Sequence, residues 1–87
     1  MHEISVCQSI VDSVIAESKA LKPPAVRVLK AKIVVGRLRA LVPESLSFAY
    51  EVLTKGTLAE GSSLEIAAAD GRELYLESME VEQDDKA

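Results

Sequence analysis

The 87-residue sequence contains very few aromatic side chains. They are Phe48, Tyr50 and Tyr75, so a surface that binds single-stranded nucleic acid by base stacking lacks its main material. The net charge of −4 also argues against a partner that is recognised through its phosphate backbone. We therefore expect no nucleic-acid partner.

Cysteine and histidine are equally scarce, with only Cys7 and His2 in the chain. One cysteine cannot form an intrachain disulfide, or a zinc site that requires two or more thiolates. A cysteine–histidine nucleophile pair would need the chain terminus as its base, and the four isolated glycines form no phosphate-binding loop. The sequence therefore predicts a protein that is not an enzyme and has no catalytic residues.

Long apolar runs are absent as well. No run reaches the roughly 18 residues that would span a bilayer, and no N-terminal stretch has the pattern of a signal peptide. We therefore expect a cytoplasmic protein with no membrane partner. The length suffices for only one hydrophobic core, so residues 1–87 are expected to form a single domain.

The first half of the chain predicts one helix and one strand. Apolar residues recur with the helical period over residues 4–21, and Pro23-Pro24 then ends the helix because proline lacks an amide proton. Residues 26–35 are rich in β-branched side chains and predict a half-buried strand. The apolar residues that we expect on its core face are Leu29, Ala31, Ile33 and Val35.

A second helix is predicted from Pro43 to Gly56, since proline is favoured in the first turn and glycine just after the last one. Its apolar stripe consists of Leu46, Ala49, Val52 and Leu53. Residues 63–69 alternate between apolar and small or charged residues and predict a second strand. Asp70-Gly71 is a strong hairpin signal, because a type I′ turn needs positive φ at both central positions.

The last predicted strand covers residues 73–82, and its apolar alternation slips by one position near residues 77–78. A β-bulge there would keep Leu74, Leu76 and Met79 on the core face together with Val81. The order is therefore helix, strand, helix, strand, hairpin, strand. This order predicts an α+β fold with two helices packed on one face of a three-stranded sheet, whose strand order stays open.

The chain start, Met1-His2-Glu3, offers nitrogen donors for a metal ion. Nickel(II) with nitrogen donors favours a square-planar arrangement. The Met1 amine, the amide nitrogens of His2 and Glu3 and the His2 imidazole can occupy its four corners after losing protons. The alternative is an ordinary chain terminus without a metal role.

Two other features have ordinary structural explanations. Cys7 lies beside the apolar stripe of the first helix, so we expect a partly buried structural thiol rather than an extra nickel ligand. Lys30 and Lys32, with Arg37 and Arg39, are expected on a solvated strand face rather than on a docking surface.

Several segments together resemble the HypA/HybF family of hydrogenase maturation (nickel-insertion) proteins. They are MHEIS at 1–5, CQSIV at 7–11, VGRLRALVPESL at 35–46, FAYEVLTKGT at 48–57 and GREL at 71–74. The resemblance covers nearly the whole chain, and its most specific parts are the Met-His-Glu start and residues 41–56.

This resemblance implies a nickel metallochaperone that works with a HypB-type GTPase to load the nickel–iron hydrogenase large subunit. The nickel site of the family falls on Met1, His2 and Glu3. Family members also carry a zinc domain with two Cys-x-x-Cys pairs, inserted where this chain has only residues 69–71. That domain is absent here, so no zinc is expected, and its loss would be either an engineered deletion or a natural reduction.

Two hypotheses from different classes follow. The first is a nickel carrier that uses the free terminus. The second is a protein-interaction module that keeps the fold while its metal role is reduced or lost. A short hairpin and few exposed aromatics favour a monomer, and a swapped dimer is the alternative.

Overall fold

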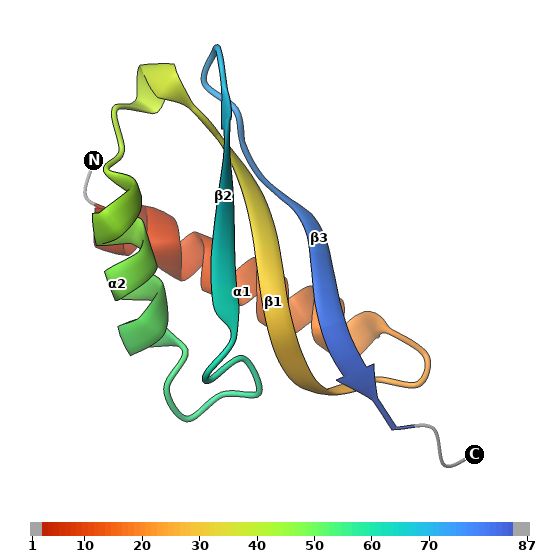
Figure 1. Cartoon of the computed structure of the whole chain (residues 1–87). Helices are drawn as coiled ribbons and strands as arrows, with labels where there is room; N and C mark the ends of the chain where they lie inside the picture. The colour runs from red at the N-terminus through yellow and green to blue at the C-terminus, as the bar shows by residue number, and fades with distance from the viewer. Residues whose placement is uncertain (1–2, 85–87) are drawn as a thin grey trace.

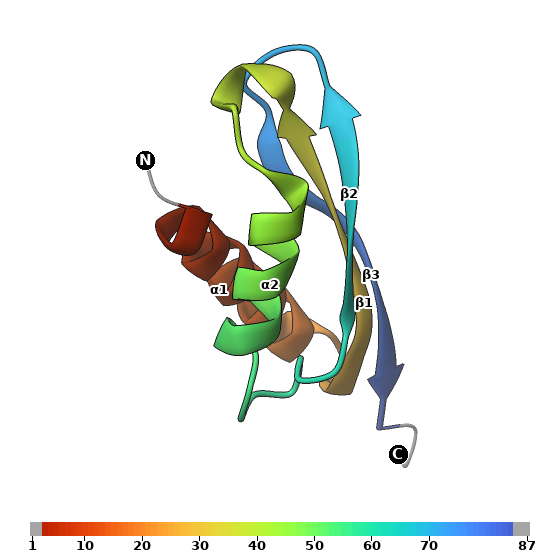
Figure 2. The same ribbon diagram turned by 60° about the vertical axis from the view of Figure 1, so that its left-hand side comes forward.

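The computed structural model of the protein describes residues 3–84, which form two α-helices, a short 3-10 helix and one three-stranded sheet. In chain order, the elements are α1 Glu3–Ala20, β1 Ala25–Gly36, η1 Arg37–Arg39, α2 Pro43–Leu53, β2 Ser63–Ala69 and β3 Leu74–Gln83. Both helices lie on the same face of the sheet (Figures 1 and 2). The predicted α+β fold is therefore confirmed.

Helix α1 follows the predicted apolar stripe closely. It buries Val6, Cys7, Ile10, Val11 and Val14 against the sheet and α2. The Ser18 hydroxyl is also buried and donates to the carbonyl oxygen of Val14 at 2.7 Å, so it needs no partner from solvent. Among residues 3–84, no helix is long and apolar enough to cross a membrane.

The prediction of a hairpin between the last two strands is wrong. The strand order is β2-β1-β3, with β2 parallel and β3 antiparallel to β1. Strand β1 takes the central place because it is the most deeply buried of the three strands. Even Val34 and Val35, which are adjacent in the strand and point to opposite faces, are both buried. The turn signal at residues 70–71 is local and cannot report which strands will pair.

Residues 70–73 instead cross over the end of β1. The amide of Gly36 donates to the carbonyl of Glu73 at 2.7 Å, and the amide of Leu38 donates to the carbonyl of Gly71 at 3.0 Å. A Cβ atom on Gly36 would lie 2.1 Å from the carbonyl oxygen of Gly71. The crossing therefore depends on a residue without a side chain at position 36.

The register between β1 and β3 contains several bulges, and one of them corrects a prediction. Leu29, expected on the core face, is 39% exposed, whereas Val28 is buried. The register shifts between Val28 and Lys30, which leaves Leu29 unpaired and turns it outward.

The predicted bulge near residue 77 is confirmed. Ile33 pairs with Leu76, and the preceding Lys32 pairs with Ser78, so Glu77 is the extra residue. The four apolar side chains that this bulge keeps against the core are Leu74, Leu76, Met79 and Val81.

The close approach at Gly36 generates a stability prediction. Gly36→Ala should lower the free energy of unfolding by about 2 to 3 kcal/mol, because the backbone of the crossing cannot move away cheaply. Chemical denaturation monitored by circular dichroism measures the change.

Gly71→Ala is the matched control. Its Cβ would first meet only the flexible carboxylate of Glu73, at 3.1 Å, so we expect a change below about 1 kcal/mol. Equal losses in the two variants would show that the crossing does not depend on position 36.

Candidate functional site

The metal site predicted from the sequence falls at the start of α1. Met1 and His2 lie outside the described residues, and Glu3 is the first residue of the helix. The carboxylate of Glu3 accepts a hydrogen bond from the amide of Val42 at 3.4 Å, and Val42 is the N-cap residue of α2. Glu3 therefore connects the starts of the two helices.

Among the described residues, the backbone amide of Glu3, unlike its side chain, makes no hydrogen bond that helps to hold the helices. The first amides of an α-helix have no acceptor within the helix, so this amide has none in α1. Over residues 3–84, no three or more histidine, cysteine, aspartate or glutamate side chains gather in a way that could hold a metal. A metal at Glu3 would therefore take its remaining donors from backbone groups or from residues outside that range.

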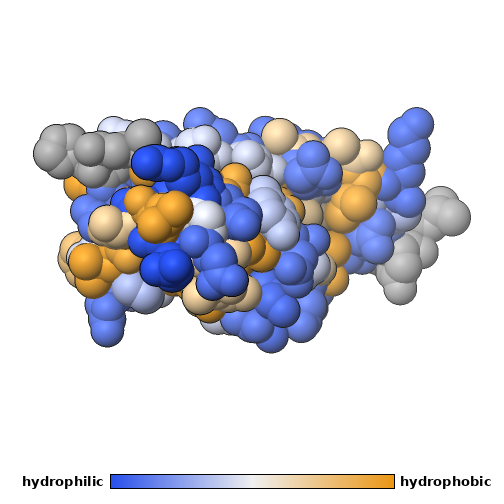
Figure 3. Space-filling view, turned by 90° about the horizontal axis from the view of Figure 1, so that it is seen from above, coloured by the Kyte–Doolittle hydropathy of each residue, from blue (hydrophilic) through white to orange (hydrophobic). Residues whose placement is uncertain are grey.

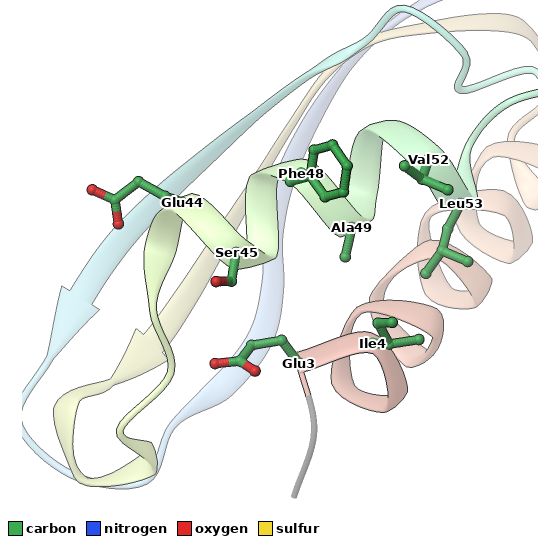
Figure 4. A pocket seen from close by; sticks show the side chains of 8 residues that line it. All are labelled: Glu3, Ile4, Glu44, Ser45, Phe48, Ala49, Val52 and Leu53. Carbon is green, nitrogen blue, oxygen red and sulfur yellow. The ribbon is translucent and has the colours of Figure 1, made fainter.

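Glu3 also forms part of an open groove between α1 and α2 that was not predicted from the sequence (Figure 4). The groove has a volume of about 530 Å³. The residues that line it are Glu3, Ile4, Glu44, Ser45, Phe48, Ala49, Val52 and Leu53.

Three apolar side chains of this groove are strongly exposed: Ile4 at 65%, Phe48 at 68% and Val52 at 47%. Of the predicted apolar stripe of the second helix, Leu46 and Ala49 are buried, whereas Val52 faces the groove and does not belong to the core. The available signal was Phe48, a large apolar residue that does not fall on the apolar stripe of the second helix.

Cys7 is the only cysteine in the chain, and its side chain is fully buried. Its Sγ donates to the carbonyl oxygen of Leu46 at 3.6 Å, which joins α1 to α2. Burial raises the pKa of the thiol to about 11. The predicted burial of this thiol is therefore confirmed, and it is complete rather than partial.

The basic residues do not form one cluster. Lys30 and Lys32 lie on the strand face away from the helices, where Lys30 pairs with Glu65 at 3.0 Å and Lys32 pairs with Glu77 at 3.2 Å. These hydrogen bonds raise the pKa of both lysines, and the bond from Lys30 lowers the pKa of Glu65. For the lysines, the predicted solvated strand face is confirmed.

The two arginines lie elsewhere, so their assignment to a strand face is wrong. Arg37 and Arg39 belong to η1, where the chain turns at the end of β1. Arg39 donates from Nε to the carbonyl of Arg72 at 2.7 Å. Seen from this end, the molecule exposes apolar residues directly beside strongly hydrophilic ones (Figure 3).

Comparison with known proteins identifies the family. A family described as hydrogenase/urease nickel incorporation, metallochaperone, HypA matches residues 1–72. The chain belongs to the HypA family. Similar proteins include the hydrogenase maturation factor HypA of Chlorobium limicola, 44% identical over 66 residues, and that of Azotobacter vinelandii, 40% identical over 72 residues.

These alignments cover 76% and 83% of this chain but 55% and 62% of the two relatives. The chain therefore spans little more than half the length of these relatives. The solution structure of the Ni metallochaperone HypA from Helicobacter pylori has the same fold, with a TM-score of 0.81 at 18% identity. That match covers 97% of this chain and all of the other chain.

The two kinds of similarity differ in extent. The family match ends at residue 72, just before β3. The match in fold leaves out only 3% of 87 residues, or about three, whereas β3 has 10 residues. Most of β3 therefore belongs to the shared fold although the family match in sequence does not reach it.

The environment of Cys7 predicts low reactivity and a specific pH dependence. Raising the pKa from 9.0 to about 11 reduces the thiolate fraction about a hundredfold, and the greater nucleophilicity of the thiolate offsets about tenfold of this loss. Because the side chain is also buried, the folded protein should react with a disulfide reagent at least about tenfold more slowly than the unfolded chain. Spectrophotometric thiol titration near about pH 8 measures this ratio.

The free energy of unfolding should also depend on pH through Cys7. The folded state holds the thiol proton more tightly than the unfolded state, so this contribution is complete below about pH 9 and is lost as the pH rises towards about 11. Cys7→Ala should remove this part of the pH dependence. Rapid thiol modification of the native protein would contradict the burial of Cys7.

Proposed function

We propose that this chain is a nickel metallochaperone domain that holds Ni(II) through Met1, His2 and Glu3 during maturation of nickel–iron hydrogenase. The observation that supports it best is a family match that begins at residue 1 and so includes these three residues. In this proposal, the chain is a carrier and not an enzyme. Its only thiol is buried and therefore poorly suited to act as a nucleophile.

The donors are the Met1 amine, the amide nitrogens of His2 and Glu3, and the His2 imidazole. The position of Glu3 favours this set, because its amide lacks an acceptor within α1. The partial positive charge at the start of a helix also stabilises an amide nitrogen that has lost its proton. The carboxylate of Glu3 is already directed to Val42, so we assign it a positioning role rather than a place on the metal.

We further propose that the carrier works in the cytoplasm. Its partners would be a HypB-type GTPase and the hydrogenase large subunit that receives the nickel. The similar proteins are named hydrogenase maturation factors, which supports a role in the same process. We expect the chain to be a monomer, and a swapped dimer is the alternative.

The extra length of the relatives would be inserted at the crossing between β2 and β3, near residues 69–71. The end of the family match at residue 72 and the shared fold beyond it support this position. The crossing is exposed at Asp70, and its other end is held by the bond between Gly36 and Glu73. An insert could extend into solvent there without disturbing the core, and a chain without it would need no zinc.

A protein-interaction module is the second candidate function. The open groove between α1 and α2 favours it, because exposed apolar side chains that gather in one place mark binding surfaces. Both functions can belong to one domain, and nickel binding separates the carrier from a module that only binds partners.

The covalent state of the terminus provides the sharpest test of the nickel site. The protein with a native Met1 should bind one nickel per chain, and His2→Ala should abolish binding. A Gly-Ser leader before Met1 should weaken binding at least about a hundredfold, because it turns the amine, with a pKa of about 7.7 to 8.0, into a far less acidic amide. Isothermal titration measures both effects.

The matched control carries the same Gly-Ser pair after Ala87 and should bind nickel like the native chain. Melting temperatures should be nearly equal among all these proteins, since the terminus contributes little to the core. Unchanged affinity in the leader variant would exclude the amine as a ligand.

The proposed absence of zinc gives a separate prediction. Metal analysis of the purified protein should find no stoichiometric zinc, and a chelator should leave its melting temperature unchanged, because the core is built from apolar side chains. Loss of the helical circular dichroism signal on adding the chelator would mean that a metal holds the fold.

A further inference from the structure

We propose that the groove between α1 and α2 binds a basic amphipathic helix of a partner protein. That the bound helix also lies against the nickel-binding residues rests on the proposed function, whereas docking itself does not. The exposed apolar residues of the groove, its charge and its place in the chain support this partner.

The apolar surface of the groove comes from both helices. Ile4 on α1 and Phe48 and Val52 on α2 stand on either side of Ala49 and Leu53 (Figure 4). Three of the eight large apolar side chains that are exposed within residues 3–84 therefore line one groove. Amphipathic helices commonly dock into grooves of this kind, with apolar residues at helical spacing as anchors.

The charge of the groove selects the partner. Glu3 and Glu44 are the charged residues that line it, and no lysine or arginine does. Both carboxylates lie where α1 and α2 begin, so the acidic charge gathers at one end of the groove. A helix whose polar face carries lysine or arginine complements this charge, whereas an acidic helix would be repelled.

The same charge disfavours two other occupants. In a two-fold dimer built on this groove, the same residues would line both sides, so no lysine or arginine would face Glu3 and Glu44 and their charge would have no complement. An anionic membrane surface would be repelled by these carboxylates.

The position of the groove connects docking to metal transfer. Glu3 and Ile4 line the groove and directly follow Met1 and His2 in the sequence. A partner helix in the groove would therefore contact the residues that directly follow the proposed donors Met1 and His2 in the sequence. The Glu3 carboxylate also accepts a hydrogen bond from the Val42 amide, which holds the first residues of α1 and α2 together at this end of the groove.

Binding of a synthetic probe tests the docking step on the metal-free chain of 87 residues. The probe is a fluorescent helical peptide of about 18 residues with leucines on one face and lysines on the other. Fluorescence anisotropy should detect binding, and Phe48→Ser should weaken it at least about tenfold. Tyr75→Ser is the matched control, because Tyr75 is a 52% exposed aromatic residue on β3, and it should bind like the parent chain.

Charge is tested in the same assay. Glu44→Lys should weaken binding about threefold or more, whereas Glu17→Lys, on the second half of α1 and outside the groove, should not. A peptide with glutamates in place of the lysines should not bind measurably.

Equal losses for Phe48→Ser and Tyr75→Ser, or equal binding of the acidic and basic peptides, would overturn the proposal. A dimer in sedimentation that Phe48→Ser dissociates would assign the groove to a second copy instead.

Nickel binding separates the docking proposal from the nickel function. Phe48→Ser should still bind one nickel. Loss of nickel from the His2 variant with intact peptide binding would support docking, whereas native protein that binds peptide but no nickel would contradict only the nickel function.

Discussion

The burial of β1 is the constraint on which the rest of the structure depends. This strand pairs with β2 along one edge and with β3 along the other, and Val28, Ala31 and Ile33 are almost completely buried under the helices. Between Lys30 and Gly36 the strand is therefore paired on both edges. The chain must therefore pass from β2 to β3 across its end, and Gly36 is the residue that allows this passage.

The second consequence of this arrangement is the way the two helices meet. The buried thiol of Cys7 donates to the backbone of α2, and the carboxylate of Glu3 accepts from the backbone just before α2. The Tyr50 hydroxyl on the other side of α2 bonds to the Ser62 hydroxyl at 2.7 Å, which fixes α2 to the segment before β2. The groove beside Ile4 and Phe48 therefore lies between elements that are fixed in place.

The sequence was sufficient to predict the elements but not their pairing. Hydrophobic period and proline placement report local geometry, so the helices and strands were found within a few residues of their observed bounds. Strand pairing depends on contacts between distant residues, and the strong local signal at Asp70-Gly71 suggested a hairpin where the chain crosses β1. The bulge that exposes Leu29 also depends on its partner strand, whereas the slip near Glu77 was visible as a break in alternation. The groove escaped prediction because it requires knowledge of which side of α2 faces α1.

The strand order also bears on how the protein folds during synthesis. Strand β1 leaves the ribosome early, but its partners are residues 63–69 and 74–83. Neither edge of β1 can therefore pair until the second half of the chain has been synthesised. Such sequence-distant pairings are slow to form, and an unpaired apolar strand is a site for aggregation in the interval. If the additional residues of the relatives lie between β2 and β3, as proposed above, that interval is longer in those proteins. Before it pairs, β1 carries the like charges of Lys30 and Lys32, which oppose its association with another copy. In the folded protein these two lysines pair with Glu65 and Glu77.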